Sequence, residues 1–191
     1  ACDWRPCVIL PGIYASQISG HLTPPYSVPT NYYSIQTATV DSGGASSVTF
    51  SSIPSTYTHL QLRITGMYSA TNNMYLQYNG DTAANYSWHQ LYGDGSSANS
   101  NGGSNQVLNY IGYSELGTTY PSVNVVDILD YTNTNKYKTI RSLFGFDRNG
   151  GGVAGFLSGS WRNTNAITSI TITPNGGNIG QYTSFALYGV K

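Results

Sequence analysis

The last third of the chain alternates apolar and polar side chains with a period of two. Four segments show this pattern: Ser122–Tyr131, Tyr137–Phe146, Ala166–Thr173 and Thr183–Val190. In the third segment, Ile170 and Ile172 fall on one face and Thr171 falls on the other. Because successive side chains of a strand point to opposite faces, these segments are predicted to be β-strands. A fifth apolar segment, Val153–Trp161, follows a Gly-rich turn at Asn149–Gly152. The last strand is expected inside a sheet, since an apolar end left loose would be unfavourable.

The rest of the chain after residue 34 continues this pattern with shorter segments. Strands are predicted at Ile35–Val40, Val48–Ile53, Leu60–Ile64, Met74–Tyr78, Tyr86–Leu91 and Gln106–Ser114. The stretch Tyr92–Asn105 is rich in Gly, Ser and Asn and is predicted to be a long exposed loop. About ten or eleven strands spaced by roughly 8–15 residues favour an all-β fold, a two-sheet antiparallel sandwich of jelly-roll type over residues 35–191.

The composition supports an all-β chain and excludes some partners. Charged residues make up 8% of the 191 residues, while Gly and Tyr number 22 and 17. Helix-favouring Glu and Lys are scarce, and strand- and turn-favouring residues are common. The net charge is zero, and the basic residues Lys136, Lys138, Arg141, Arg148 and Arg162 are interleaved with aspartates, so no nucleic-acid partner is expected. A neutral, hydroxyl-rich surface suits an oligomer or a particle.

Residues 1–34 differ from the rest and are predicted to form an extended arm. They contain five prolines, which cannot occupy a sheet interior. Their apolar residues, among them Trp4, Ile9, Ile13 and Tyr14, are expected to contact either the chain's own domain or, preferably, a neighbour. Cys2 and Cys7 could form a local or intersubunit disulfide, remain free thiols or, least favoured, bind metal. No apolar run is long enough to span a membrane, and no signal peptide is visible. Ala1 is compatible with removal of an initiator Met.

Four segments resemble structural proteins of tailed-bacteriophage virions. These are residues 12–22 (GIYASQISGHL), 47–63 (SVTFSSIPSTYTHLQLR), 127–138 (DILDYTNTNKYK) and 184–191 (SFALYGVK). The proteins resembled are described as tail-fibre, minor tail or head-decoration components, and the resemblance spans roughly residues 12–191. It implies a place on the surface of a phage particle and brings no catalytic residues.

The sequence offers little catalytic chemistry. No catalytic motif surrounds the three histidines His21, His59 and His89, and Glu115 is the single glutamate. Asp81 and Asp94, near Asn79, Asn85 and Asn99, could ligate calcium, but their spacing fits no known loop motif and turn formation explains them equally well. No cofactor is expected, and the chain is predicted not to be an enzyme.

Aromatic residues are the strongest candidates for a binding surface. Tyr86, Trp88, Tyr92, Tyr110, Tyr113, Tyr120 and Trp161 could stack on sugar rings, or they could cover strand faces and fill intersubunit contacts. The resulting hypothesis is a head-decoration (cement) protein that forms a homo-oligomer, expected to be a trimer, and clamps neighbouring capsid subunits. The alternative is a tail-fibre or receptor-binding module for host-surface glycans. In either role, the expected partners of the chain are further copies of itself and other virion proteins, such as major capsid or tail proteins.

Overall fold

The computed structural model describes residues 31–68, 72–114 and 117–191. Contacts divide the chain into residues 1–31 and 32–191, and the second unit holds the whole described fold. The predicted arm, with Trp4, Ile9, Ile13, Tyr14, His21 and the pair Cys2 and Cys7, lies outside the described residues, as does Glu115. Within the described ranges the chain forms twelve strands and no helix, so no membrane-spanning helix occurs among these residues.

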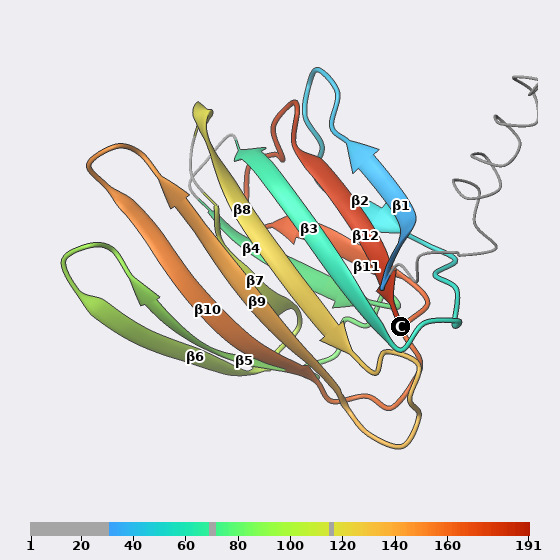
Figure 1. The fold of residues 1–191 in the computed structure, drawn as a ribbon. Coiled ribbons are helices and arrows are strands. Elements are labelled where there is room, and N and C mark those ends of the chain that lie inside the picture. Colours follow the sequence, from blue (N-terminus) through green and yellow to red (C-terminus); the bar gives the residue numbers. More distant parts are fainter. Residues whose placement is uncertain (1–30, 69–71, 115–116) are drawn as a thin grey trace, which may run out of the picture. The chain divides into compact units, whose positions relative to one another are not determined.

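The twelve strands form two antiparallel sheets (Figure 1). The larger sheet contains eight strands in the order β1 (Tyr32–Thr39), β12 (Ser184–Val190), β3 (His59–Tyr68), β8 (Gly117–Leu129), β9 (Lys138–Asp147), β10 (Gly152–Trp161), β5 (Tyr86–Gly93) and β6 (Ala98–Gln106). The smaller sheet contains four strands in the order β2 (Val48–Phe50), β11 (Ile170–Pro174), β4 (Asn72–Tyr78) and β7 (Asn109–Ser114). The prediction of an all-β sandwich is therefore confirmed, while the jelly-roll topology stays a prediction.

The edge strands of both sheets are irregular or short. The pairing of β1 with β12 shifts register between Ser34 and Gln36, and that of β5 with β6 shifts between Tyr86 and Trp88. In the smaller sheet, the pairing of β4 with β7 shifts between Met74 and Tyr75. The remaining edge strand, β2, is only three residues long. Each of the four sheet edges thus departs from a long, regular strand.

The core lies between the two sheets because the inner face of each strand is apolar. Strand β9 shows the cause: Ile140, Ser142 and Phe144 are buried, whereas the alternate residues Arg141 and Leu143 are exposed. Leu60, Leu62 and Ile64 of β3 are buried in the same way. This periodicity of two fixes the register, since a slip of one residue would expose every buried side chain.

Glycines on the inner face of β10 make room for side chains of the facing strand β7 and of the neighbouring strand β9. A Cβ atom at Gly159 would lie 2.4 Å from Asn109 Oδ1, and one at Gly155 would lie 2.6 Å from Phe144. Beside them the large rings of Trp161, Tyr78 and Tyr86 are fully buried, with the Tyr78 and Trp161 ring centroids 5.4 Å apart. Small and large residues therefore alternate, as close packing requires.

Two polar side chains, Asp81 and Lys138, stabilise the loops by hydrogen bonding at the end of the sandwich opposite the β5–β6 and β9–β10 turns. Asp81 accepts hydrogen bonds from Asn85 Nδ2 at 2.9 Å and from Trp161 Nε1 at 2.7 Å. Lys138 is fully buried, and its Nζ donates to the carbonyl oxygens of Asn133, Lys136 and Thr164. Both groups tie segments that are distant in sequence, so their side chains hold the loops in place.

One large sequence-based prediction is wrong. Tyr92–Asn105, expected to be an exposed loop, instead contains the end of β5, a turn at residues 94–97 and most of β6. Strand β6 pairs with β5 from Ala98 onward, and this backbone pairing outweighs the low strand propensity of its Gly, Asn and Ser residues. In addition, β1 begins at Tyr32, so residues 32–34 belong to the sandwich rather than to the predicted arm.

Candidate functional site

An exposed apolar patch lies on the face of the larger sheet that points away from the core. Phe156 of β10 pairs with Leu91 of β5 on one side and with Leu143 of β9 on the other. These three side chains are exposed by 59%, 45% and 64%, respectively. Leu143 pairs in turn with the partly buried Val125 of β8, and Val123 nearby is 45% exposed. We call Leu91, Val123, Val125, Leu143 and Phe156 the apolar patch.

The position of the apolar patch follows from strand alternation. Phe144 and Leu157, the sequence neighbours of Leu143 and Phe156, are buried in the core. Successive side chains point to opposite faces, so Leu143 and Phe156 must point outward. The strands β9 and β10 are thus apolar on both faces near their centres. Two-sided apolar strands are typical of a sheet that is covered on both sides.

A chain of polar contacts crosses the same face beside the apolar patch. The Arg63 guanidinium lies over the rings of Tyr32 and Tyr188, at 5.2 and 4.9 Å from their centroids, and Arg63 Nε donates to Gln61 Oε1 at 2.7 Å. Gln61 Nε2 donates to Asp127 Oδ1 at 2.8 Å. Arg141 reaches Asp127 Oδ2 at 3.2 Å. These contacts pair the charges of the face with one another or with aromatic rings.

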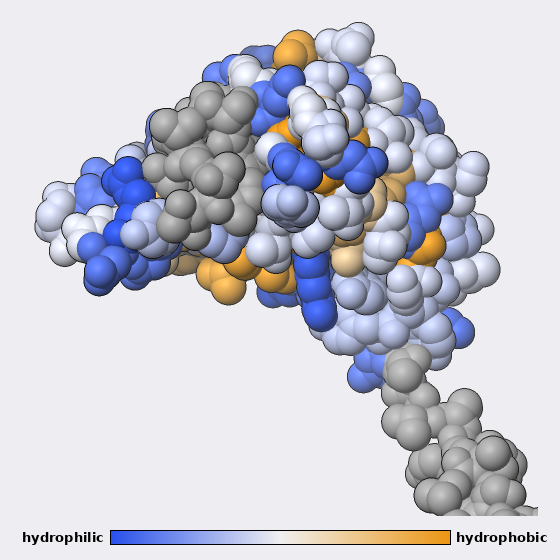
Figure 2. All heavy atoms as spheres, turned by 90° about the horizontal axis from the view of Figure 1, so that it is seen from above, coloured by the Kyte–Doolittle hydropathy of each residue, from blue (hydrophilic) through white to orange (hydrophobic). Residues whose placement is uncertain are grey.

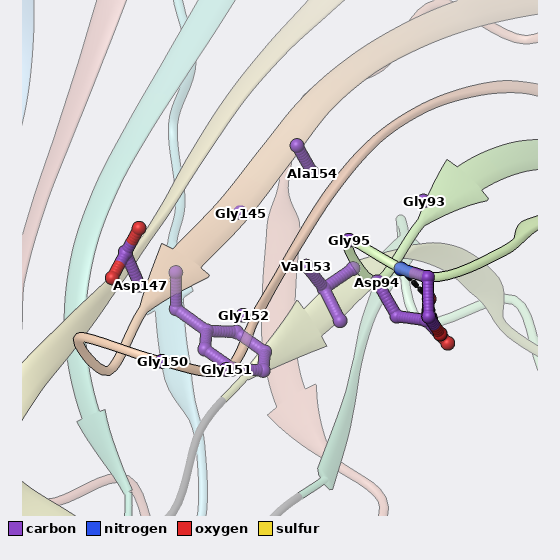
Figure 3. A pocket seen from close by; sticks show the side chains of 12 residues that line it. Gly93, Asp94, Gly95, Gly145, Asp147, Gly150, Gly151, Gly152, Val153 and Ala154 are labelled. Atoms are coloured by element: carbon purple, nitrogen blue, oxygen red, sulfur yellow. Dashed lines mark hydrogen bonds between the residues drawn. The ribbon is translucent and has the colours of Figure 1, made fainter.

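A hollow of about 880 Å³ lies where the β5–β6 and β9–β10 turns meet (Figure 3). The two turns are neighbours because Gly93 of β5 pairs with Ala154 of β10. Half of the twelve lining residues are glycines, so much of its wall is peptide backbone. Figure 3 shows Asp147 on one side of this hollow and Asp94 on the other. In Figure 2 the end of the sandwich that carries these turns, at the left, is largely hydrophilic.

The two aspartates at the hollow stabilise their own turns. Asp94 Oδ1 accepts hydrogen bonds from Ser96 N, Ser96 Oγ and Ser97 N at 2.8–2.9 Å. These bonds, those from Ser96 first, lower the pKa of Asp94 from its ordinary value. Asp147 Oδ1 accepts a hydrogen bond from Asn149 N at 2.7 Å. Both carboxylates present acceptor oxygens at the rim of the hollow, suited to the hydroxyl groups of a neutral ligand.

The aromatic residues proposed from sequence belong to the core rather than to a sugar-stacking surface. Tyr86, Tyr110 and Trp161 are buried, at 0%, 1% and 1% exposure. Trp88 packs on Tyr110 with ring centroids 4.7 Å apart, and Tyr92 packs on Tyr113 at 5.3 Å. Trp88, Tyr92 and Tyr113 are partly buried and pack against the core, so these rings are mostly covered and do not form an open platform for a glycan. Tyr120 differs, with 40% of its surface exposed.

The structure also bears on the calcium site considered for Asp81 and Asp94. Asp81 precedes β5 and Asp94 follows it, so the strand separates the two carboxylates that were considered together. The side-chain oxygen of Asn79 is already engaged within the fold, because it accepts hydrogen bonds from Thr168 N at 2.8 Å and Ser169 N at 3.1 Å. In the described part of the chain, no group of three or more His, Cys, Asp or Glu side chains is arranged to hold a metal ion.

The histidines in the described ranges have ordinary structural surroundings. His59 Nδ1 accepts a hydrogen bond from Asp130 N at 2.9 Å and lies 3.4 Å from Asp130 Oδ1. Asp130 is also paired with Lys136, which secures the turn between β8 and β9. His89 is exposed on the outward face of β5, beside Gly102 of the edge strand β6.

Sequence reasoning missed the apolar patch, although a signal for it was present. Leu143 and Phe156 each stand at a position where strict alternation would place a polar residue. Which strands lie side by side, and hence that these residues meet, required the sheet order. Comparison with protein-family models, with curated proteins and with solved structures finds no match to this chain.

Proposed function

We propose that this chain is a non-enzymatic structural protein on the surface of a tailed-phage virion, a head-decoration protein that clamps neighbouring capsid subunits. The observation that carries the proposal is the apolar patch on a broad, well-paired sheet. Contiguous exposed apolar surface is uncommon on free monomers and marks a contact with another protein. A face of this kind suits a rigid structural protein that binds its neighbours through apolar packing and catalyses no reaction.

The arrangement of the strands gives further support. When the hairpins β5–β6 and β9–β10 are set aside, eight strands remain, which we call the eight-strand frame. Renumbered from one to eight, they run 1-8-3-6 in one sheet and 2-7-4-5 in the other. This is the order expected from two Greek keys folded into a jelly roll, an architecture used by viral capsid and lectin domains. We therefore interpret the fold as a jelly roll whose larger sheet is widened by two inserted hairpins.

Localisation on the intact particle tests the proposal directly. Cryo-electron microscopy of the virion is expected to show density for this β-sandwich repeating on the head lattice, at the junctions between capsid subunits. Fitting the structure should place the larger sheet toward a protein neighbour. Density confined to the tail tip or fibres would overturn the head-decoration proposal, and absence from purified virions would overturn the virion proposal as a whole.

A glycan-binding role is the second candidate, and the hollow between the β5–β6 and β9–β10 turns is the observation that favours it. Backbone groups, Asp94 and Asp147 could together bind the hydroxyl groups of a neutral saccharide. Ala154→Trp would fill the hollow, whereas Ser158→Trp on the same strand would leave it open. Binding on a glycan array that is lost only in Ala154→Trp would support this role, and equal binding by both variants would contradict it.

A further inference from the structure

We infer that the apolar patch is a contact between copies of this chain, in which the outward faces of two larger sheets pack against each other. The inference deepens the proposed function, on which it rests for the biological role of the contact, because it names the partner of the apolar patch. The basis is geometric: Leu143, Phe156 and Leu91 form a row across three neighbouring strands, exposed by 64%, 59% and 45%.

The charge pattern of the face fits a second copy better than a charged partner. A surface that meets its own copy must carry little net charge, or the two copies repel. Beside the apolar patch, Arg141 and Asp127 neutralise each other at 3.2 Å. The Arg63 guanidinium lies between two tyrosine rings. The face therefore presents apolar side chains bordered by charges that are paired with each other or lie against tyrosine rings. Two such faces can meet without charge repulsion.

The size of the face also fits a stable contact. Eight strands spaced about 4.8 Å apart, with about seven paired residues each, cover roughly 34 by 23 Å, or on the order of 800 Å². A standard protein–protein interface buries about 800 Å² on each partner. Sheets that pack face to face interdigitate their side chains in the same way as the inner faces of a sandwich.

The edges of the larger sheet argue for face contact over strand addition. Both edge strands, β1 and β6, contain register shifts, and such irregularities interfere with the pairing of a further strand. The apolar patch is also centred on β9 and β10, which lie inside the sheet rather than at its edge. Two copies therefore meet most favourably through the middle of the face.

The mass of the full chain in solution tests the inference. A Cys2→Ser, Cys7→Ser background removes disulfide effects, and sedimentation or light scattering then gives the mass across a concentration series. We expect an oligomer of the 20.6 kDa chain in this background. Leu143→Glu and Phe156→Glu should each weaken association by at least about tenfold, since either buries a charge in the contact. Thr49→Glu, at an exposed position of the smaller sheet, is the matched control.

Folding and proximity are checked separately. Circular dichroism and thermal unfolding should be close to wild type for all three variants, because the substituted side chains are exposed. Leu143→Cys in the cysteine-free background should form a disulfide-linked pair under mild oxidation, whereas Thr49→Cys should not. A monomeric parent chain, or an oligomer unaffected by Leu143→Glu, would overturn the inference. These measurements use no virion, so their failure is distinguishable from a failure of the head-decoration proposal.

Discussion

A single buried lysine, Lys138, holds several loop segments together by hydrogen bonding. Lys138 has no exposed surface, and its Nζ donates to three carbonyl oxygens, those of Asn133, Lys136 and Thr164. Burial, followed by the charge of Lys136, lowers its pKa from the ordinary value. A single side chain thus joins the β8–β9 turn to the segment that follows β10. The interleaving of Lys138 with aspartates in the sequence gives no sign of this burial, because hydrogen bonds across distant loops leave no local pattern.

Replacing this lysine should destabilise the fold. Lys138→Met keeps most of the volume but leaves the carbonyl oxygens of Asn133, Lys136 and Thr164 without this donor, and we expect a loss of about 1–3 kcal/mol in the free energy of unfolding. Lys136→Met removes only an exposed pair with Asp130 and should change stability by less than about 1 kcal/mol. Urea unfolding monitored by tryptophan fluorescence measures both. Equal effects of the two substitutions would contradict the role assigned to Lys138.

Asp81 makes the stability of the fold depend on pH in the acidic range. Burial opposes its ionisation, but hydrogen bonds from Asn85, Trp161, Ala83 and Asn163 outweigh burial and lower its pKa below 3.8. A carboxyl whose folded pKa is depressed stabilises the fold fully above its unfolded pKa and loses that contribution as the pH falls through the folded value. The stability contributed by Asp81 is therefore present at neutral pH, begins to decrease below about pH 4 and is lost as the pH falls through the depressed folded pKa.

The pH profile of unfolding checks this assignment. Asp81→Asn should lower the melting temperature near pH 7, and its curve should approach that of the wild type as the pH falls through the depressed pKa of Asp81. Asp41→Asn, at an exposed turn, serves as the control and should follow the wild-type curve. A difference between Asp81→Asn and the wild type that stays constant across the whole pH range would show that the ionised carboxylate is not responsible.

At the scale of elements, the two inserted hairpins distinguish this sandwich from its eight-strand frame. They double the width of one sheet (Figure 1). Their residues line the hollow and include Leu91, Leu143 and Phe156 of the apolar patch. The hairpin β9–β10 was predictable, because both strands alternate and Asn149–Gly152 marks the turn. The strand β6 was not, since its residues Ala98–Gln106 have no alternation. Only its pairing with β5 makes it a strand, and this pairing is not encoded locally.

Close packing between β10 and β7 depends on glycine. We predict that Gly159→Ala destabilises the protein by about 1–3 kcal/mol through overpacking, because the new methyl group would lie 2.4 Å from Asn109 Oδ1 and 2.8 Å from Ile140. Ser158→Ala, the exposed neighbour on the same strand, should have little effect. Thermal unfolding of the two variants compares them. A Gly159→Ala protein as stable as the wild type would show that the sheets can separate slightly at low cost.

At the scale of the whole molecule, the hydrophobic core is contained in the sandwich. The buried apolar residues of the described chain run from Val40 to Leu187. We predict that a chain lacking residues 1–30 keeps its β-sheet circular dichroism and unfolds in one transition, while its attachment to virions is lost. Sedimentation with purified particles measures attachment. Retained attachment would contradict the expectation that the N-terminal arm contacts a neighbouring protein of the particle.

The sequence predicts the class of the fold better than the site. Alternation in segments such as Ala166–Thr173 is local, so two antiparallel sheets were predictable. The apolar patch depends on which strands are neighbours, and β5 reaches β10 across more than sixty residues of sequence. The aromatic residues misled the site prediction for a related reason. Tyr and Trp suit both surfaces and interiors, and only the sheet order shows that Tyr110 and Trp161 lie inside.

The irregular sheet edges have a consequence for how such a protein can be made in quantity. Long, flat edge strands template the growth of fibrils and aggregates, particularly in chains with few charges to keep them apart. Here three edges carry register shifts, and the fourth strand has three residues. Although only 8% of its residues are charged, the folded chain therefore offers few edges on which another copy could polymerise through its backbone.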